Sequence, residues 1–174
     1  MGIKAVGAQF DQSQNFPPDA EIIFREWCIN TTAITNLCSS RVATRLPRSA
    51  ELPFLTIFNA GGTLMSPTSE AAVTGAAITV DAYAGRWGGG GTTSQPDYAN
   101  AYALANAVAE SAFKMKSTRV VTPTTNTAAV IYSMEVQGLP SRIEETDTGL
   151  GHYQLSLIMY YRGLDWYEED KSKN

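Results

Sequence analysis

The amino-acid sequence predicts a single α+β domain: a roughly four-stranded sheet, mixed or antiparallel, with two flanking helices in the order α-β-β-α-β-β. Two segments, near 77–84 and 152–162, alternate between core-type and polar residues with the period of two that half-buried strands show. A third segment, near 97–113, repeats small and apolar residues every three or four places, as an amphipathic helix does. The length of 174 residues suits one domain with a sizeable core.

The first helix is predicted over about residues 19–38. Asp19 follows two prolines and can cap the helix, and Glu21 lies at the positive end of the helix dipole. The Thr31-Thr32 pair weakens the helix locally, because β-branched side chains lose rotamer freedom there. The apolar residues continue at helical spacing through both halves of the segment: Ile23, Trp27, Ile34 and Leu37.

A short apolar strand, entered through Pro53, is predicted over 54–58, and the turn residues from Asn59 to Gly62 are expected to end it. A polar loop over 61–75 then leads into the strand near 77–84. That strand places Ile78, Val80 and Ala82 on one face and Thr79, Asp81 and Tyr83 on the other.

The helix near 97–113 presents one face of mostly small side chains, which would allow close packing on a sheet: Ala101, Leu104, Ala105, Val108 and Ala112. A loop is expected over 117–127. The strand at 128–137 is expected to direct Val130, Tyr132, Met134 and Val136 to one face. The strand at 152–162 has the longest alternation in the chain, with Tyr153, Leu155, Leu157, Met159 and Tyr161 on one face.

Three parts are therefore expected along the chain. Residues 1–16 form a Gln-rich N-terminal arm with little periodicity, residues 17–163 form the α+β domain, and residues 164–174 form a C-terminal tail with two aromatic residues and several acids. No internal repeat is evident.

Composition excludes several function classes. The net charge of -4 argues against a general binder of nucleic acid or of anionic membranes, because either would need a basic face. No apolar run approaches the ~20 residues needed to span a bilayer, and the N-terminus lacks a secretory h-region. Charged residues make up only 17% of the chain. Such a weakly charged surface is compatible with a protein covered by partners and equally with a protein free in solution.

No pattern of catalytic, cofactor-binding or metal-ligating residues is found, and we expect a protein that is not an enzyme. His152 is the only histidine and no G-x-S-x-G motif accompanies it, so a structural or surface role is expected. The glycine run 88–91 lacks the Lys-Ser/Thr of a phosphate-binding loop. The acids at 144–147 do not reproduce a calcium loop. Cys28 and Cys38, placed on one helix, would lie about 15 Å apart and stay reduced.

Six residues are candidates for contacts with other subunits or proteins: Arg41, Arg45, Arg86, Trp87, Trp166 and Tyr167. Arg41, Arg45 and Arg48 would share one edge of a helical turn, either as a solvated surface or against an acidic neighbour. Arg86 and Trp87 stand at the mouth of the glycine-rich loop over 86–95, which is expected to be mobile until a partner orders it. The tail aromatics either fold back on their own domain or meet a partner.

The order of these segments resembles the tail-terminator, or tail-completion, proteins of long-tailed bacteriophages. The resemblance spans roughly residues 19–163. It rests on RVATRLP after the first helix, the Gly-Gly-terminated strand LPFLTIFNAGG, the strand ITVDAYAG, the helix start DYANAYALANAV and the last strand HYQLSLIMYYRG.

The resemblance implies a virion protein made in the host cytoplasm and built into the tail or neck. Such proteins form a ring, commonly a homohexamer, that ends tail-tube polymerisation and docks the head–tail connector protein. It implies no cofactor, no membrane and no sequence-specific nucleic acid, although the ring would let DNA pass. Another head–tail joining or tail tube protein is the related alternative. A small α+β ligand-binding module or an enzyme is the alternative from a different class, and a rigid monomer with a ligand would favour it.

Overall fold

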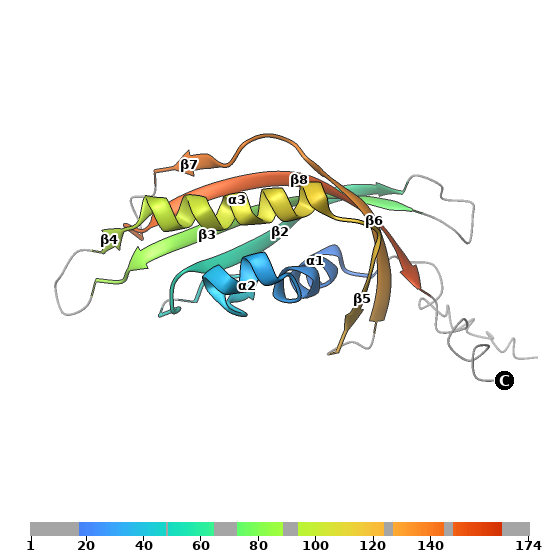
Figure 1. The fold of residues 1–174 in the computed structure, drawn as a ribbon, viewed down its shortest axis with the longest axis horizontal. Helices are drawn as coiled ribbons and strands as arrows, with labels where there is room; N and C mark the ends of the chain where they lie inside the picture. Colours follow the sequence, from blue (N-terminus) through green and yellow to red (C-terminus); the bar gives the residue numbers. More distant parts are fainter. Residues whose placement is uncertain are drawn as a thin grey trace, which may run out of the picture.

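The computed structural model describes residues 18–47, 49–64, 73–88, 94–123, 127–144 and 148–164 (Figure 1). Three helices lie in these residues: α1 Ala20–Ile29, α2 Thr32–Cys38 and α3 Tyr98–Lys114. The strands of the same residues are β1 Val42–Ala43, β2 Phe54–Leu64, β3 Thr74–Arg86, β4 Gln95–Pro96, β5 Thr118–Thr122, β6 Thr127–Val136, β7 Ser141–Ile143 and β8 Gly151–Leu164.

The strands form one mixed sheet in the order β1-β2-β3-β8-β6-β5, with β4 beside β3 and β7 beside β8. Only the β1–β2 pair is parallel among the described pairs. The four strands expected from the sequence are present as β2, β3, β6 and β8. The predicted strand number is nevertheless too low and the predicted order α-β-β-α-β-β differs from the observed one, because α2, β5 and the short β1, β4 and β7 are added to it.

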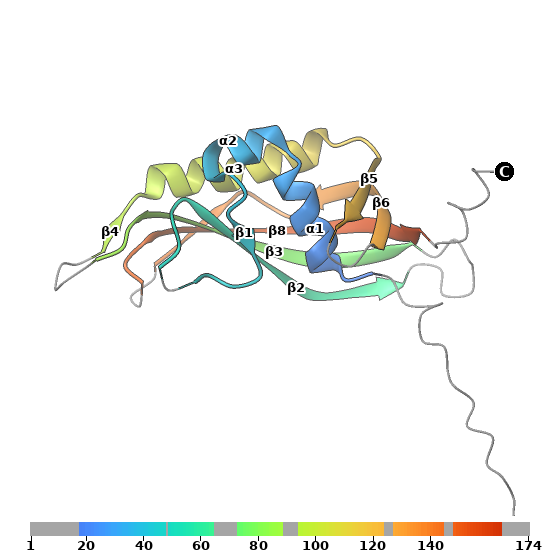
Figure 2. The same cartoon turned by 90° about the horizontal axis from the view of Figure 1, so that it is seen from below.

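All three helices lie on one face of this sheet (Figure 2). A single apolar cluster fills the space between helices and sheet. Ile23 and Phe24 come from α1, Leu104 from α3, and Leu155 and Leu157 from β8, and each is at most 1% exposed. The opposite face of the sheet carries no helix in the described part of the chain, so it is the broad surface that the fold leaves open.

The predictions of a helix near 97–113 and of a strand at 152–162 are confirmed by α3 and β8. The buried residues of α3 are the five that the sequence pattern identified, and Asp97 accepts a hydrogen bond from the Asn100 amide at its start. In β8 the predicted inward residues Leu155, Leu157, Met159 and Tyr161 are buried. Both elements have long, regular patterns, and their side-chain periods therefore identify them without help from the rest of the chain.

The predicted helix over 19–38 is wrong in one respect: it is broken into α1 and α2. Asp19 caps α1 as expected, through a 2.9 Å bond from the Glu21 amide. At the break, the Asn30 side-chain amide and the Thr31 hydroxyl donate to the carbonyls four residues earlier, each at 2.7 Å. These bonds compete with continuation of the helix, and Thr31 instead becomes the extended residue before α2.

The Gly61-Gly62 pair does not end β2, contrary to the prediction. The strand continues to Leu64, and its pairing with β3 shifts register between Asn59 and Gly61. Gly61 has a φ of 122°, which glycine adopts readily and other residues rarely do, so the pair produces a β-bulge instead of a turn. The rest of the loop predicted over 61–75 lies largely outside the described residues.

Two predictions near the sheet's far edge are also wrong. The expected loop over 117–127 contains β5, whose Val120 is buried beside Ala129 of β6. In β6 the buried residues are Ala129, Ile131 and Met134, so of the four predicted residues only Met134 is buried. A register shift between Ile131 and Ser133 inserts one residue and changes which side chains face the core. Tyr132, at the shift, is 41% exposed.

Candidate interaction surface

The helix-free face of the sheet is formed by alternate residues of its central strands. Register places Tyr83 opposite His152, Asp81 opposite Gln154 and Thr79 opposite Ser156. These side chains point away from the apolar cluster because strand residues alternate between faces. The predicted polar faces of β3 and β8 therefore meet side by side, which the separate patterns alone did not show.

A polar cluster lies at one end of this face. The Oδ1 atom of Asp81 lies 2.9 Å from His152 Nε2 and accepts a 2.9 Å hydrogen bond from Gln154 Nε2. A carboxylate only accepts, so Nε2 carries the proton. Tyr83 stacks on the His152 ring with centroids 4.4 Å apart, and His152 is 4% exposed. The cluster joins β3 to β8 by buried polar contacts, in agreement with a structural role for His152.

Arg41 holds the segment between β1 and β2. Its Nε donates to the Pro53 carbonyl at 3.0 Å, and its guanidinium pairs with Glu51 at 3.2 Å. The helical turn predicted for Arg41 and Arg45 is absent: the chain enters β1 at Val42, and Arg45 follows in an exposed bend. Arg48 lies outside the described residues. Contacts of Arg41 and Arg45 with a neighbouring subunit stay a prediction.

We expect Arg41→Lys to lower the free energy of unfolding by about 1 kcal/mol, because an ammonium cannot reproduce the Nε bond to Pro53 while also reaching Glu51. Glu51→Gln should cost less than about 0.5 kcal/mol, since the Glu51 side chain is 86% exposed and the pair is screened by water. Urea denaturation of the two variants measures the difference. Equal losses would show that the exposed ion pair, not the carbonyl bond, holds this segment.

Trp87 also contacts the segment between β1 and β2. Its indole Nε1 donates to the Ala50 carbonyl at 2.8 Å, and the side chain is half-buried. Arg86, the last residue of β3, is exposed and pairs in register with Gln95. The sequence placed Trp87 at a loop mouth; the structure shows that it also fixes residue 50 of its own chain.

Other predicted contact residues fall outside the described part of the chain. Trp166 and Tyr167 do so, as does the centre of the glycine-rich loop at 89–93. Of the acids at 144–147, Glu144 is described, and it pairs with Arg142 of its own chain at 3.7 Å.

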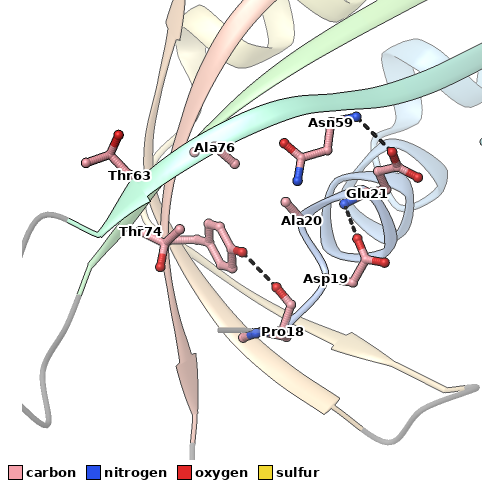
Figure 3. A pocket seen from close by; sticks show the side chains of 10 residues that line it. Pro18, Asp19, Ala20, Glu21, Asn59, Thr63, Thr74 and Ala76 are labelled. Carbon is pink, nitrogen blue, oxygen red and sulfur yellow. Dashed lines mark hydrogen bonds between the residues drawn. The ribbon is translucent and has the colours of Figure 1, made fainter. Parts of the chain in front are cut away.

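A groove that the sequence did not indicate lies between the start of α1 and the paired strands β2 and β3 (Figure 3). Its volume is about 530 Å³. Glu21 bridges the two walls: its carboxylate accepts a 2.8 Å bond from the Asn59 amide of β2. The lining residues are Pro18, Asp19, Ala20, Glu21, Asn59, Gly62, Thr63, Thr74, Ala76 and Tyr161.

Tyr161 of β8 also lines this groove. Its hydroxyl donates to the Pro18 carbonyl at 2.7 Å, and the side chain is 2% exposed. Burial, with a smaller contribution from the charge of Asp19, raises the pKa of Tyr161 from 10.0 to about 12. The unfolded chain therefore loses this proton first as pH rises, and stability falls between about pH 10 and pH 12.

We expect Tyr161→Phe to reduce stability at neutral pH by about 1 kcal/mol, through loss of the hydroxyl bond. The same variant should lose less stability than the wild type between pH 10 and pH 12, because it has no phenol to titrate. Urea denaturation at several pH values measures both effects, with Tyr132→Phe as the control on an exposed phenol. Parallel alkaline losses in wild type and Tyr161→Phe would contradict this linkage.

Both cysteines are free and buried, as predicted, although they lie on different helices. Burial raises the pKa of Cys38 to about 11, and the nearby Arg41 partly offsets this effect. Burial also raises the pKa of Cys28 well above its usual value. Both thiols are therefore protonated at neutral pH and poor nucleophiles.

Among the comparisons with known proteins, the search of solved structures gives a match. Neither the known protein families nor the curated proteins include a match to this sequence. The fold is similar to a chain in a solved structure described as the virion of a native gene transfer agent particle, with a TM-score of 0.52 and 10% sequence identity. The similarity covers 87% of this chain and 98% of that one. At this identity the likeness is one of fold, and it extends over nearly the whole of both chains.

The described residues contain neither a helix suited to crossing a membrane nor a candidate metal site. None of the helices there combines the length and apolar character required to cross a bilayer. No three of the described histidine, cysteine, aspartate or glutamate side chains are grouped in a way that could hold a metal ion.

Proposed function

We propose that this protein is a structural component of a phage-like virion: a tail terminator that forms a ring at the head-proximal end of the tail tube. The ring would stop tube polymerisation and give the head–tail connector its docking surface. Six copies is the expected number, following the resemblance in segment order.

The single observation that carries the proposal is the likeness in fold to a chain of the gene transfer agent virion over 87% of this chain. The segment order supports it independently, because that order is evident in the sequence alone. A sheet whose described helices all lie on one face also suits assembly, since the described part of the chain leaves its other face open to contacts.

The role we propose is contact and not catalysis. The chain's one histidine is held by Asp81 and stacked on Tyr83, so its imidazole already has structural partners. Both thiols are buried with raised pKa values. These placements favour a scaffold over a site for chemistry.

A tube assembly experiment tests the proposal. The tail tube protein of the same particle is allowed to polymerise with and without this protein, and tube lengths are measured by electron microscopy. We expect shorter tubes with an added ring on one end, and no effect from heat-unfolded protein. Incorporation along the tube wall would indicate a tube protein. Unchanged lengths without capping would reject the terminator function.

The charge of Arg45 provides a more local test. Arg45→Glu should weaken self-association by about tenfold at low salt and less at high salt, if this exposed arginine meets an acidic neighbour in the ring. Arg45 has no part in the contacts of Arg41 with Pro53 and Glu51, so the fold should be unaffected.

Lys116→Glu is the matched control, because it makes the same change in net charge at another exposed position. Sedimentation velocity at two salt concentrations compares the variants. Equal weakening by both substitutions would indicate a general effect of charge and would remove Arg45 from the interface.

A further inference from the structure

The groove beside α1 has the form of a site for an extended chain. One wall is the start of α1, from Pro18 to Glu21, and the other is β2 beyond its bulge, at Gly62 and Thr63. Ala76 lies between the two walls (Figure 3), and Thr74 and Tyr161 also line the groove. Several of the lining side chains are small, which leaves room for a backbone with small or aliphatic side chains.

The β2 wall offers hydrogen-bonding groups to such a chain. Strand β1 pairs with β2 only at Leu55 and Thr56. The backbone amide of Asn59 already donates a hydrogen bond to the Glu21 carboxylate. Beyond it, from Gly61 to Leu64, β2 has no strand on its outer side in the described part of the chain. An exposed strand edge of this kind can accept one more strand.

Thr74 is an independent sign that the groove is incomplete. The residue is 7% exposed and lines the groove, yet its hydroxyl has no hydrogen-bond partner among the described residues. Buried hydroxyls are nearly always paired, because leaving one unpaired costs about 1–3 kcal/mol. A bound backbone would supply the missing partner.

We propose that the N-terminal arm of a neighbouring copy, residues 1–16 together with the adjoining Pro17, binds in this groove as an added strand. The inference rests on the proposed ring, in which every subunit has both an arm and a groove. The arm joins the body at Pro18, in the wall of its own groove. At about 3.3 Å per residue, residues 1–17 extend to about 55 Å, enough to reach an adjacent domain of this size.

Sequence favours a neighbouring groove over the arm's own. Pro17 and Pro18 fix φ near the extended region, so an extended arm that can reach a neighbouring copy is expected from the sequence. Charges also match, because Lys4 can face Asp19 and Glu21. Residues 3–8 of the arm, IKAVGA, are small or aliphatic apart from that lysine, which suits a groove lined by Ala20, Gly62 and Ala76.

Engineered disulfides test the exchange in full-length protein assembled on tail tubes. Thr63→Cys is combined with Ala5→Cys or, because strand register is not fixed beforehand, with Gln9→Cys. We expect at least one pair to give covalent multimers on non-reducing denaturing gels after mild oxidation. Leu139→Cys, at an 84% exposed position outside the groove, replaces Thr63→Cys in the control and should leave monomers.

A truncation and a peptide supply the second measurement. Deletion of residues 1–16 should leave the thermal transition intact but weaken the ring at least about tenfold, and a synthetic peptide of residues 1–17 should bind the truncated protein. The same peptide with Lys4→Glu should bind about tenfold more weakly.

The outcomes separate the two proposals. Cross-linked monomers, which migrate faster on the gel, would show that the arm occupies its own groove and would overturn the exchange. A ring that persists undiminished without the arm, with no cross-links from either pair, would also overturn it while leaving the proposed function standing. Absence of any ring in the wild type would reject the proposed function itself.

Discussion

Gly151→Ala is expected to destabilise the fold by about 3 kcal/mol, which corresponds to a fall in Tm of about 6–12 °C for a domain of this size. Gly151 begins β8 directly against the start of α3. A Cβ at this position would lie 2.6 Å from the Asp97 carbonyl oxygen and 2.7 Å from the Tyr98 nitrogen. Both are backbone atoms in the cap of α3, so relief requires the helix to move off the sheet.

Gly138→Ala is the matched control. Gly138 follows β6, and a Cβ there would meet nothing within 4 Å. We expect no loss of stability, or a gain of up to about 1 kcal/mol from the less flexible unfolded chain. Calorimetry of the two variants and the wild type measures the difference. Similar Tm values for Gly151→Ala and Gly138→Ala would mean that α3 does not pack this closely on β8.

Asp81→Ala should cost about 3 kcal/mol, because it removes the acceptor shared by His152 and Gln154. His152 is 4% exposed, so its ring nitrogen cannot turn to water without opening the pair of strands. Asp81→Asn keeps an oxygen acceptor without the charge, and we expect about half of this loss.

Ser156→Ala is the control for Asp81, since Ser156 is exposed on the same face two residues from Gln154. Urea denaturation should show almost no change for it. If Asp81→Ala were equally harmless, the polar cluster would contribute nothing to stability. Its retention on the open face would then have to be explained by contacts with another protein.

The sequence predicted the centre of this fold better than its edges. Helix α3 and strand β8 have long regular patterns, and burial follows those patterns residue by residue. The sequence of β6 alternates in the same way. One extra residue near Tyr132, however, changes which of the later side chains face the core. Gly61 looks like a strand end for a related reason: glycine suits a turn and a bulge equally well, and only the pairing with β3 decides between them.

The candidate surfaces were harder to predict because their contacts join distant parts of the chain. Trp87 bonds to Ala50, 37 residues away, and Asn59 to Glu21, 38 residues away. Local patterns carry no information about such pairs. The second of these contacts and the bond from Tyr161 to Pro18 both join residues that line the groove, so no local signal in the sequence indicated it.

Electron cryomicroscopy of tails assembled with this protein tests the central claim most directly. The proposed function predicts a closed ring with this fold at one end of the tail tube, on the side where the head connector binds, and nowhere along the tube. Density of this fold repeated along the tube wall, or tails complete at both ends without it, would contradict the claim that the protein ends the tube.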